Sequence, residues 1–154
     1  MDSYHPSAKL RSEHADALVV HCSDHRLQGV LQEFLNNGLK LSGNYDVLAI
    51  PGGPQCLTLV EYLPKFSWAS GKWFRFLIEK HDLKRLILIA HQDCGWYHEL
   101  PFHLFGSTDP RTRQEDDLRR ARRTLTSQFP QVRVDLFYVA WDADLRVVIE
   151  PVAG

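Results

Sequence analysis

The sequence predicts an α/β fold in which a mostly parallel sheet of about five strands is flanked by helices. Three short runs, ALVVHC (17–22), YDVLAI (45–50) and RLILIA (85–90), are almost continuously apolar. Such runs are typical of strands that are buried on both faces of a parallel sheet. Segments long enough for helices separate them, and two further strand-like runs follow. This alternation is that of an α/β layer fold.

Helices are expected between these strands. After the first strand, the apolar residues Leu27, Val30, Leu31, Phe34 and Leu35 recur at helical spacing. Between the second and third strands, LTLVEYL (57–63) and WFRFLIEKH (73–81) can each form a helix, and Pro64 and Gly71 are expected to break the segment between them. A further helix is predicted from about Gln114 to Gln128. Its apolar face carries Leu118, Ala121, Leu125 and Phe129, and its first turn carries Glu115, Asp116 and Asp117.

The last two strands are expected to form an antiparallel hairpin. Residues 132–140 (VRVDLFYVA) and 145–150 (LRVVIE) flank a short WDAD connection. A chain of 154 residues with 44% hydrophobic content can bury a core without disulfides. Because no internal repeat or linker divides it, we expect residues 1–154 to form a single domain.

The net charge and the cysteine content of the chain bear on which partners and which compartment are expected. The net charge is −1, so nothing favours binding to nucleic acid or to an anionic membrane, and we expect neither. The one basic cluster, Arg119, Arg120, Arg122 and Arg123, is better explained as a solvated helix face paired with nearby acids than as a phosphate-binding surface. No apolar run approaches the roughly 18 residues of a membrane span, and the N-terminus lacks a signal-peptide core. Three widely spaced cysteines suit a reducing compartment, so we expect a cytoplasmic protein.

Polar side chains follow the three apolar strands where each strand ends. In open parallel sheets, ligands bind beyond these carboxyl ends. The first strand ends in His21-Cys22-Ser23-Asp24-His25-Arg26, the second in Pro51-Gly52-Gly53-Pro54, and the third in His91-Gln92-Asp93-Cys94-Gly95. If the first and third strands are neighbours, Cys22 and His91 emerge about 4.8 Å apart, and Cys94 can curl back toward them.

Two thiolates and one imidazole form a donor set suited to Zn²⁺ and leave a fourth position for water or a carboxylate. Each residue also has a simpler explanation, because a cysteine at a strand end is commonly a small apolar residue and a lone histidine is commonly a hydrogen-bonded polar group. The convergence of Cys22, His91 and Cys94 with an Asp-x-Arg pair favours a metal site. Cys56, which falls at the start of a helical crossover, is expected only to pack.

The two polar segments resemble known motifs. Residues 22–26 resemble the Cys-x-Asp-x-Arg motif of the β-class carbonic anhydrases, and residues 91–95 resemble the His-x-x-Cys-Gly motif of that family. The resemblance extends over most of the chain, including the closing hairpin. Two departures are a histidine, His25, where the family usually has a small residue, and Ile50-Pro51-Gly52-Gly53 in place of an Arg-Asn-Ala-Gly-like turn. The chain is also shorter than most members.

The resemblance implies a fold, a cofactor and a mechanism. The sheet would have the order 2-1-3-4-5 with an antiparallel last strand, and one Zn²⁺ per chain would be bound by Cys22, His91 and Cys94. Asp24 and Arg26 would form the catalytic dyad, in which Arg26 keeps the Asp24 carboxylate off the metal so that water can bind. The expected reaction is attack of zinc hydroxide on CO₂, the reversible hydration to bicarbonate.

Alternatives to this reaction remain. The same apparatus could act on a CO₂ analogue such as carbonyl sulfide or carbon disulfide. In a third interpretation, Asp24 permanently completes a closed four-ligand site, and the protein is a non-catalytic zinc-binding module. His98 and His103 could shuttle protons or serve as alternative ligands, although a surface or packing role is favoured.

An aromatic segment follows the third strand and contains Trp96, Tyr97, Phe102, Leu104 and Phe105. Such a patch is more often covered by a partner chain than left in water. The sequence therefore predicts a homodimer or a higher homo-oligomer, as the family resemblance also implies.

Overall fold

A five-stranded sheet organises the computed structural model, which describes residues 3–10, 14–58, 64–99 and 109–154. Its order is β2-β1-β3-β4-β5. The strands are β1 (Ala17–His21), β2 (Tyr45–Ala49), β3 (Arg85–His91), β4 (Arg133–Trp141) and β5 (Val147–Pro151). Strands β1 to β4 run parallel, and β5 pairs antiparallel with β4. The predicted fold class and strand order are confirmed.

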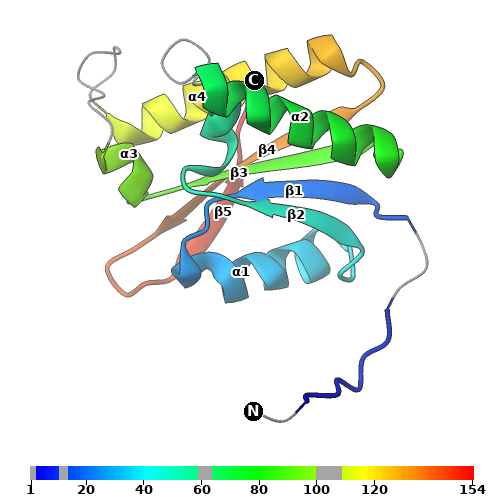
Figure 1. Ribbon diagram of the computed structural model, residues 1–154. Coiled ribbons are helices and arrows are strands. Elements are labelled where there is room, and N and C mark those ends of the chain that lie inside the picture. Colours follow the sequence, from blue (N-terminus) through cyan, green and yellow to red (C-terminus); the bar gives the residue numbers. More distant parts are fainter. Residues whose placement is uncertain (1–2, 11–13, 59–63, 100–108) are drawn as a thin grey trace.

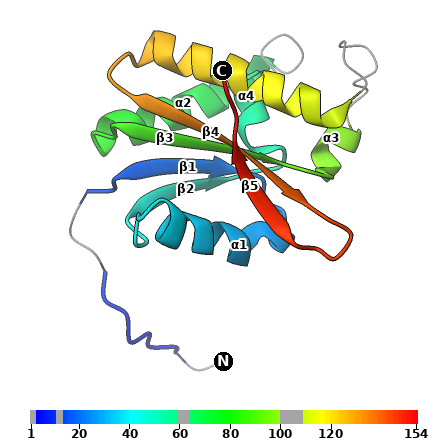
Figure 2. The ribbon, with the colours of Figure 1, turned by 180° about the vertical axis from the view of Figure 1, so that it is seen from behind.

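Helices cover both faces of this sheet (Figures 1 and 2). One face carries α1 (Gln28–Glu33), which is extended on either side by the helical turns η1 (His25–Leu27) and η2 (Phe34–Gly38). The other carries α2 (Pro64–Lys80) and α4 (Pro110–Gln128), together with the turn η3 (Gly53–Leu57). The short helix α3 (Gly95–Glu99) lies just beyond the carboxyl end of β3 (Figure 1).

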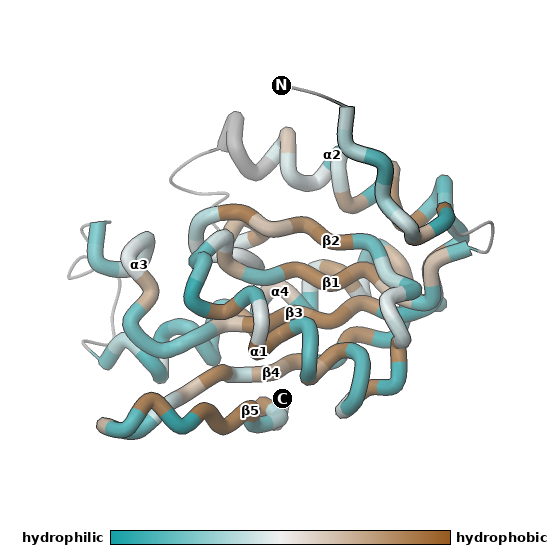
Figure 3. Tube along the Cα trace, turned by 90° about the horizontal axis from the view of Figure 1, so that it is seen from below, coloured by the Kyte–Doolittle hydropathy of each residue, from teal (hydrophilic) through white to brown (hydrophobic). Residues whose placement is uncertain are grey.

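Two apolar layers sandwich the sheet because successive strand side chains point to opposite faces. On the α2/α4 side, Leu86 and Leu88 of β3 belong to one cluster with Phe74, Ile78 and Leu118. On the α1 side, the cluster includes Val19, Ile87, Ile89, Leu31 and Leu35. All of β1 is buried, and hydrophobic residues follow β1 and β3 through the middle of the molecule (Figure 3). The α1-side cluster also contains Cys22 and Cys94, so the strand-end cysteines adjoin the core.

The crossover helix α2 differs from its prediction. It continues through Gly71, so the expected break at that glycine is wrong. A Cβ atom at Gly71 would meet nothing within 4 Å, and one glycine costs a helix only about 1 kcal/mol. Pro64 begins the helix, a position where its missing N–H needs no partner. Residues 59–63, most of the proposed LTLVEYL helix, lie outside the described residues.

Helix α4 begins one turn earlier than predicted. The Asp109 side chain caps its N-terminus by accepting a hydrogen bond from the Thr112 N–H at 2.8 Å, and Pro110 occupies the first turn. The acids at 115–117 therefore lie beyond the first turn, and the predicted interaction with the helix dipole is wrong. Arg119 instead pairs with Glu115 and Asp116 on the helix surface, as expected. Within the described ranges, no helix combines the length and apolar character needed to cross a bilayer.

Candidate metal centre

Cys22, His91 and Cys94 lie together at the carboxyl edge of the sheet. Cys22 is the first residue after β1, and His91 is the last residue of β3, the strand that pairs with β1. One ligand atom from each of the three side chains lies within 4.8 Å of the other two, and all three residues are buried. The sulfurs of Cys22 and Cys94 are 3.8 Å apart. The chain therefore places two sulfur donors and one imidazole nitrogen around one point.

The imidazole of His91 is oriented for metal binding. Its Nδ1 lies 2.8 Å from the carbonyl oxygen of Gln92, and because a carbonyl can only accept, Nδ1 carries the proton. In the neutral ring with this tautomer, the other nitrogen, Nε2, carries the lone pair that can bind a metal, and it has no hydrogen-bond partner among the described residues. A buried nitrogen without a partner is unfavourable unless something binds it. A cation held between this nitrogen and the two sulfurs would remove that cost.

Cys94 returns toward β1 because the chain turns sharply at Asp93. Asp93 has φ 53°, in the left-handed region that aspartate tolerates better than most residues. Helix α3 starts directly after Cys94, and the Tyr97 N–H donates to the Cys94 carbonyl oxygen at 2.9 Å. Burial disfavours the thiolate at both sulfurs. Nearby backbone N–H groups, of Trp96 and Tyr97 for Cys94 and of Asp24 and Gly52 for Cys22, partly offset this effect of burial on the pKa of each thiol.

The two thiols also act on each other. The hydrogen bond from Cys94 lowers the pKa of Cys22, and the same contact raises the pKa of Cys94. Two thiolates this close together would repel each other. A divalent cation bound between them would offset this repulsion and favour the deprotonated form of both.

The turn after β2 requires its two glycines. Gly52 and Gly53 have φ of 72° and 53°. A Cβ atom on Gly53 would lie 2.9 Å from the His21 carbonyl carbon and 3.0 Å from the Cys22 nitrogen, both backbone atoms. This loop also exchanges backbone hydrogen bonds with the end of β1, from Ser23 N–H to Ile50 and from Ile50 N–H to His21. The Gly-Gly pair therefore fixes the position of Cys22.

Arg26 holds the Asp24 carboxylate at the edge of the site. The guanidinium donates from Nε to Oδ2 at 3.0 Å and from Nη2 to Oδ2 at 2.7 Å, and Nε also contacts Oδ1. The hydrogen bonds from Arg26 lower the pKa of Asp24 to about 2, so the carboxylate is ionised over the ordinary pH range. Arg26 itself is fixed by Asp93, whose Oδ2 and carbonyl oxygen each lie 3.1 Å from it.

Trp141, at the end of β4, was not identified from the sequence. Its ring stacks on His91 with centroids 6.3 Å apart, and the Arg26 guanidinium lies over it at 5.4 Å. Its backbone N–H donates to the side chain of Gln92, the residue that orients His91. Only the three-dimensional pairing of β4 with β3 brings it to the site. A single aromatic residue at the end of a strand gives no sign of this role in the sequence.

His25 and His98 have exposed side chains and are not among the three residues that the site brings together. The His25 side chain is 94% exposed, and His98 lies 3.4 Å from Asp93 at the rim. His103, with Phe102, Leu104 and Phe105, lies outside the described residues. Cys56 is buried in the α2/α4-side cluster, where burial raises the pKa of its thiol to about 12, consistent with packing alone.

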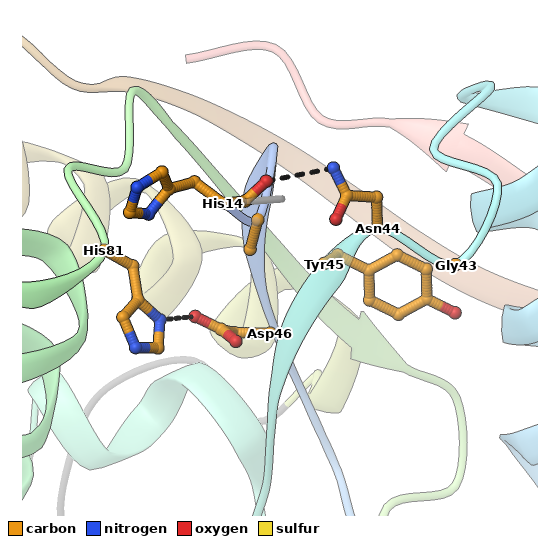
Figure 4. Close-up of a pocket in the computed structure, with 7 residues that line it drawn as sticks. His14, Gly43, Asn44, Tyr45, Asp46 and His81 are labelled. Atoms are coloured by element: carbon orange, nitrogen blue, oxygen red, sulfur yellow. Dashed lines mark hydrogen bonds and ion pairs between the residues drawn. The ribbon is translucent and has the colours of Figure 1, made fainter. Parts of the chain in front are cut away.

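A second group of polar side chains lies toward the opposite end of the sheet. His14, Asn44, Asp46 and His81 line an open cavity of about 300 Å³, and His81 Nδ1 lies 2.5 Å from an Asp46 oxygen (Figure 4). Asp46 pairs in register with Leu18, four residues before Cys22, a separation of roughly 13 Å along the strand. These groups belong to another surface and not to the candidate metal centre.

Comparisons with known proteins agree on the fold. No model of a known protein family matches the chain. Uncharacterized proteins of Rickettsia bellii and Rickettsia conorii are 27% and 25% identical to it, over 88% of this chain and 83% and 73% of their own. Solved carbonic anhydrases are similar in structure, with TM-scores of 0.56 for those of Glaciozyma antarctica and Aspergillus fumigatus, the latter a β-carbonic anhydrase.

These two enzymes are 14% and 17% identical to the chain, and the alignments cover 92% of it and 83% and 78% of the enzymes. Tetrameric β-carbonic anhydrases of Sordaria macrospora give a TM-score of 0.50 at 13% identity, with 90% of this chain and 81% of the solved one covered. At this level of identity the similarity shows a shared fold.

The close approach at Gly53 leads to a prediction. Gly53→Ala should lower the free energy of unfolding, because the added methyl group meets the backbone of His21 and Cys22 and because φ is positive. The cost should be about 1–3 kcal/mol. Gly71→Ala, in the middle of α2 with open space around it, is the matched control and should stabilise by up to about 1 kcal/mol. Urea denaturation of both variants tests this, and equal stability of the two would contradict the role given to the Gly-Gly turn.

Proposed function

We propose that this protein is a zinc enzyme of the carbonic anhydrase type, which catalyses the reversible hydration of CO₂ to bicarbonate. The proposed ligands are Cys22 Sγ, His91 Nε2 and Cys94 Sγ. The observation that carries the proposal is the buried His91 Nε2, which has no hydrogen-bond partner among the described residues and lies beside two thiols. The shared fold of the β-carbonic anhydrases supports the assignment.

The donor set favours zinc over other common metals. Two thiolates and an imidazole are softer than the oxygen ligands that Mg²⁺ and Ca²⁺ require. Three protein ligands leave one position open, which is the arrangement of catalytic rather than structural zinc sites. When bound, the ion would supply the Lewis acidity that lowers the pKa of water and makes it a nucleophile.

Asp24 and Arg26 have separate proposed roles. Both Asp24 oxygens contact the Arg26 guanidinium, so the carboxylate stays directed toward Arg26 instead of completing the metal site. Asp24 remains an ionised acceptor and can orient a water molecule through a hydrogen bond. Arg26 is the positioning group, and its contacts with Asp93 and Trp141 restrict its own movement.

Two alternatives use the same residues. In the first, the substrate is a linear CO₂ analogue such as carbonyl sulfide or carbon disulfide, and comparing turnover of CO₂ with that of carbonyl sulfide separates the two substrates. In the second, Asp24 binds zinc permanently, and the protein is a non-catalytic binding module. The Asp24–Arg26 pair favours an enzyme, because a closed structural site does not need a cation that holds its fourth ligand away.

We also propose that the protein forms a homodimer or a higher homo-oligomer and that it is located in the cytoplasm. The Sordaria macrospora enzymes of this fold are tetramers. In this chain Trp96 and Tyr97 pack against the α1-side core, whereas Trp68, Trp73 and Phe76 of α2 are exposed. Exposed aromatic residues on one helix are consistent with a covered surface in an oligomer. The free cysteines suit a reducing compartment.

The ligand assignment predicts metal content. The purified protein should bind about one zinc ion per chain. Cys22→Ser and Cys94→Ser should each weaken zinc retention by several orders of magnitude, because a neutral hydroxyl cannot replace a thiolate. Cys56→Ser, at a buried cysteine outside the site, should retain zinc and serves as the control. Elemental analysis after dialysis against a chelator measures this, and full occupancy in both ligand variants would rule out the proposed site.

The role of Arg26 predicts a variant that keeps zinc and loses activity. Arg26→Ala releases Asp24, so that its carboxylate can occupy the open metal position. Stopped-flow CO₂ hydration should fall by about 10–100-fold while zinc content is unchanged. Arg146→Ala removes an arginine that pairs with Asp144 away from the site and should behave as wild type. A fully active Arg26→Ala enzyme would exclude this role.

A further inference from the structure

A buried polar network lies behind the candidate metal centre and uses none of its ligands. Its members are Asp117 of α4, Tyr97 and Trp96 of α3, and Gln55 of η3, and we call it the Asp117 network. The Tyr97 hydroxyl donates to Asp117 Oδ2 at 2.8 Å, and Gln55 Nε2 donates to the same oxygen at 3.3 Å. Trp96 Nε1 donates to Gln55 Oε1 at 2.6 Å. The network thus joins three segments that are far apart in the sequence.

This network buries a carboxylate, which is unfavourable unless the contacts compensate. Asp117 is 9% exposed, and burial raises the pKa of its carboxyl group. Gln55 and Tyr97 are 2% and 8% exposed. An apolar residue at position 117 would avoid this desolvation cost in a helix that is otherwise built on Leu118, Ala121 and Leu125. The position therefore calls for an explanation beyond packing.

Each end of the network reaches one of the two cysteines. Trp96 and Tyr97 follow Cys94 in the first turn of α3, where the Tyr97 N–H donates to the Cys94 carbonyl oxygen at 2.9 Å. The Trp96 indole also packs on Gly52, so closely that a Cβ atom there would lie 2.2 Å from its Cδ1. The next residue, Gly53, lies against the backbone of Cys22, where a Cβ atom would be 3.0 Å from the Cys22 nitrogen. Contacts therefore run from the backbone of Cys94 through α3, Asp117 and the glycine turn to the backbone of Cys22.

We propose that Asp117 is a positioning residue, which fixes α3 and the Gly52 turn and so sets where the backbone holds the two sulfur ligands. This inference rests on the proposed metal site and deepens it, because it names the residue that sets the spacing of the two sulfurs. Asp117 is not itself one of the proposed ligands. Its effect passes through Tyr97 and through Gln55 with Trp96.

The geometry dictates which variants are informative. The hydrogen bonds from Tyr97 and Gln55 both go to Asp117 Oδ2, so Asp117→Asn can present its carbonyl oxygen to the same two donors and should bind zinc nearly as wild type. Asp117→Leu keeps the branched shape of the side chain and loses both hydrogen bonds. Tyr97→Phe removes only one hydroxyl and remains informative if Asp117→Leu does not fold.

Two further variants are controls. Ile78→Ala makes a cavity in α2 on the same side of the sheet and controls for loss of stability alone. Tyr45→Phe removes a hydroxyl near the opposite end of the sheet (Figure 4).

Zinc affinity measured by competition with a chromogenic chelator tests the proposal. Asp117→Leu and Tyr97→Phe should bind zinc on the order of 10-fold more weakly, as is typical when a supporting contact of a metal site is lost. Asp117→Asn, Tyr45→Phe and Ile78→Ala should stay near the wild-type affinity. Unchanged affinity in both Tyr97→Phe and Asp117→Leu, or equal weakening in Ile78→Ala, would overturn the positioning role.

Amide hydrogen exchange of the metal-free protein separates this inference from the proposed function. Tyr97→Phe should speed exchange at the Trp96 and Tyr97 amides by about 10-fold and leave the amides of β1 and β3 unchanged, because only α3 loses its contact. Unchanged exchange at these two amides would contradict the proposal whether or not zinc binds. If the wild-type protein binds no zinc but Tyr97→Phe still speeds exchange at these two amides, the result would contradict the proposed function and leave the positioning of α3 standing.

Discussion

The parallel pairing of β1 with β3 is the constraint on which the candidate site depends. Val19 and Ile87 are partners in this pairing, at the centre of a sheet covered on both faces. The two strands are separated by more than 60 residues of chain, including α1, β2 and α2. Burial of their apolar side chains makes up for the cost of closing that loop. Because parallel strands end at the same edge, the pairing places Cys22 beside His91.

Local contacts then orient the side chains of Cys22, His91 and Cys94 as metal ligands. The Gln92 carbonyl selects the tautomer of His91, the left-handed Asp93 returns Cys94, and the glycine turn supports Cys22. The two sulfurs lie 3.8 Å apart. The contacts of Arg26 with Asp24, Asp93 and Trp141 form a second layer at the rim. A cation at this point would favour the thiolate form of both cysteines.

The sequence predicted the strands and the candidate ligands, because each follows a regular pattern of residue types. Continuous apolar runs identified β1, β2 and β3, and the spacing of cysteine, histidine and Asp-x-Arg identified the residues now found at one edge. Helix boundaries were less accurate. Gly71 does not break α2 because the packing of the helix on the sheet outweighs the low helix propensity of glycine. Helix α4 starts at the Asp109 cap, which lies ahead of the apolar pattern in the sequence. Trp141 and Asp117 could not be recognised, since their roles arise from tertiary contacts between segments distant in sequence.

The central claim is that one metal ion is coordinated by two sulfurs and one imidazole nitrogen of this chain. Zinc K-edge X-ray absorption of the metal-loaded protein measures that coordination shell directly. The account predicts two sulfur scatterers at about 2.3 Å, one imidazole nitrogen at about 2.0 Å and one further light atom. A shell with a single sulfur, or one built only from nitrogen and oxygen, would contradict it.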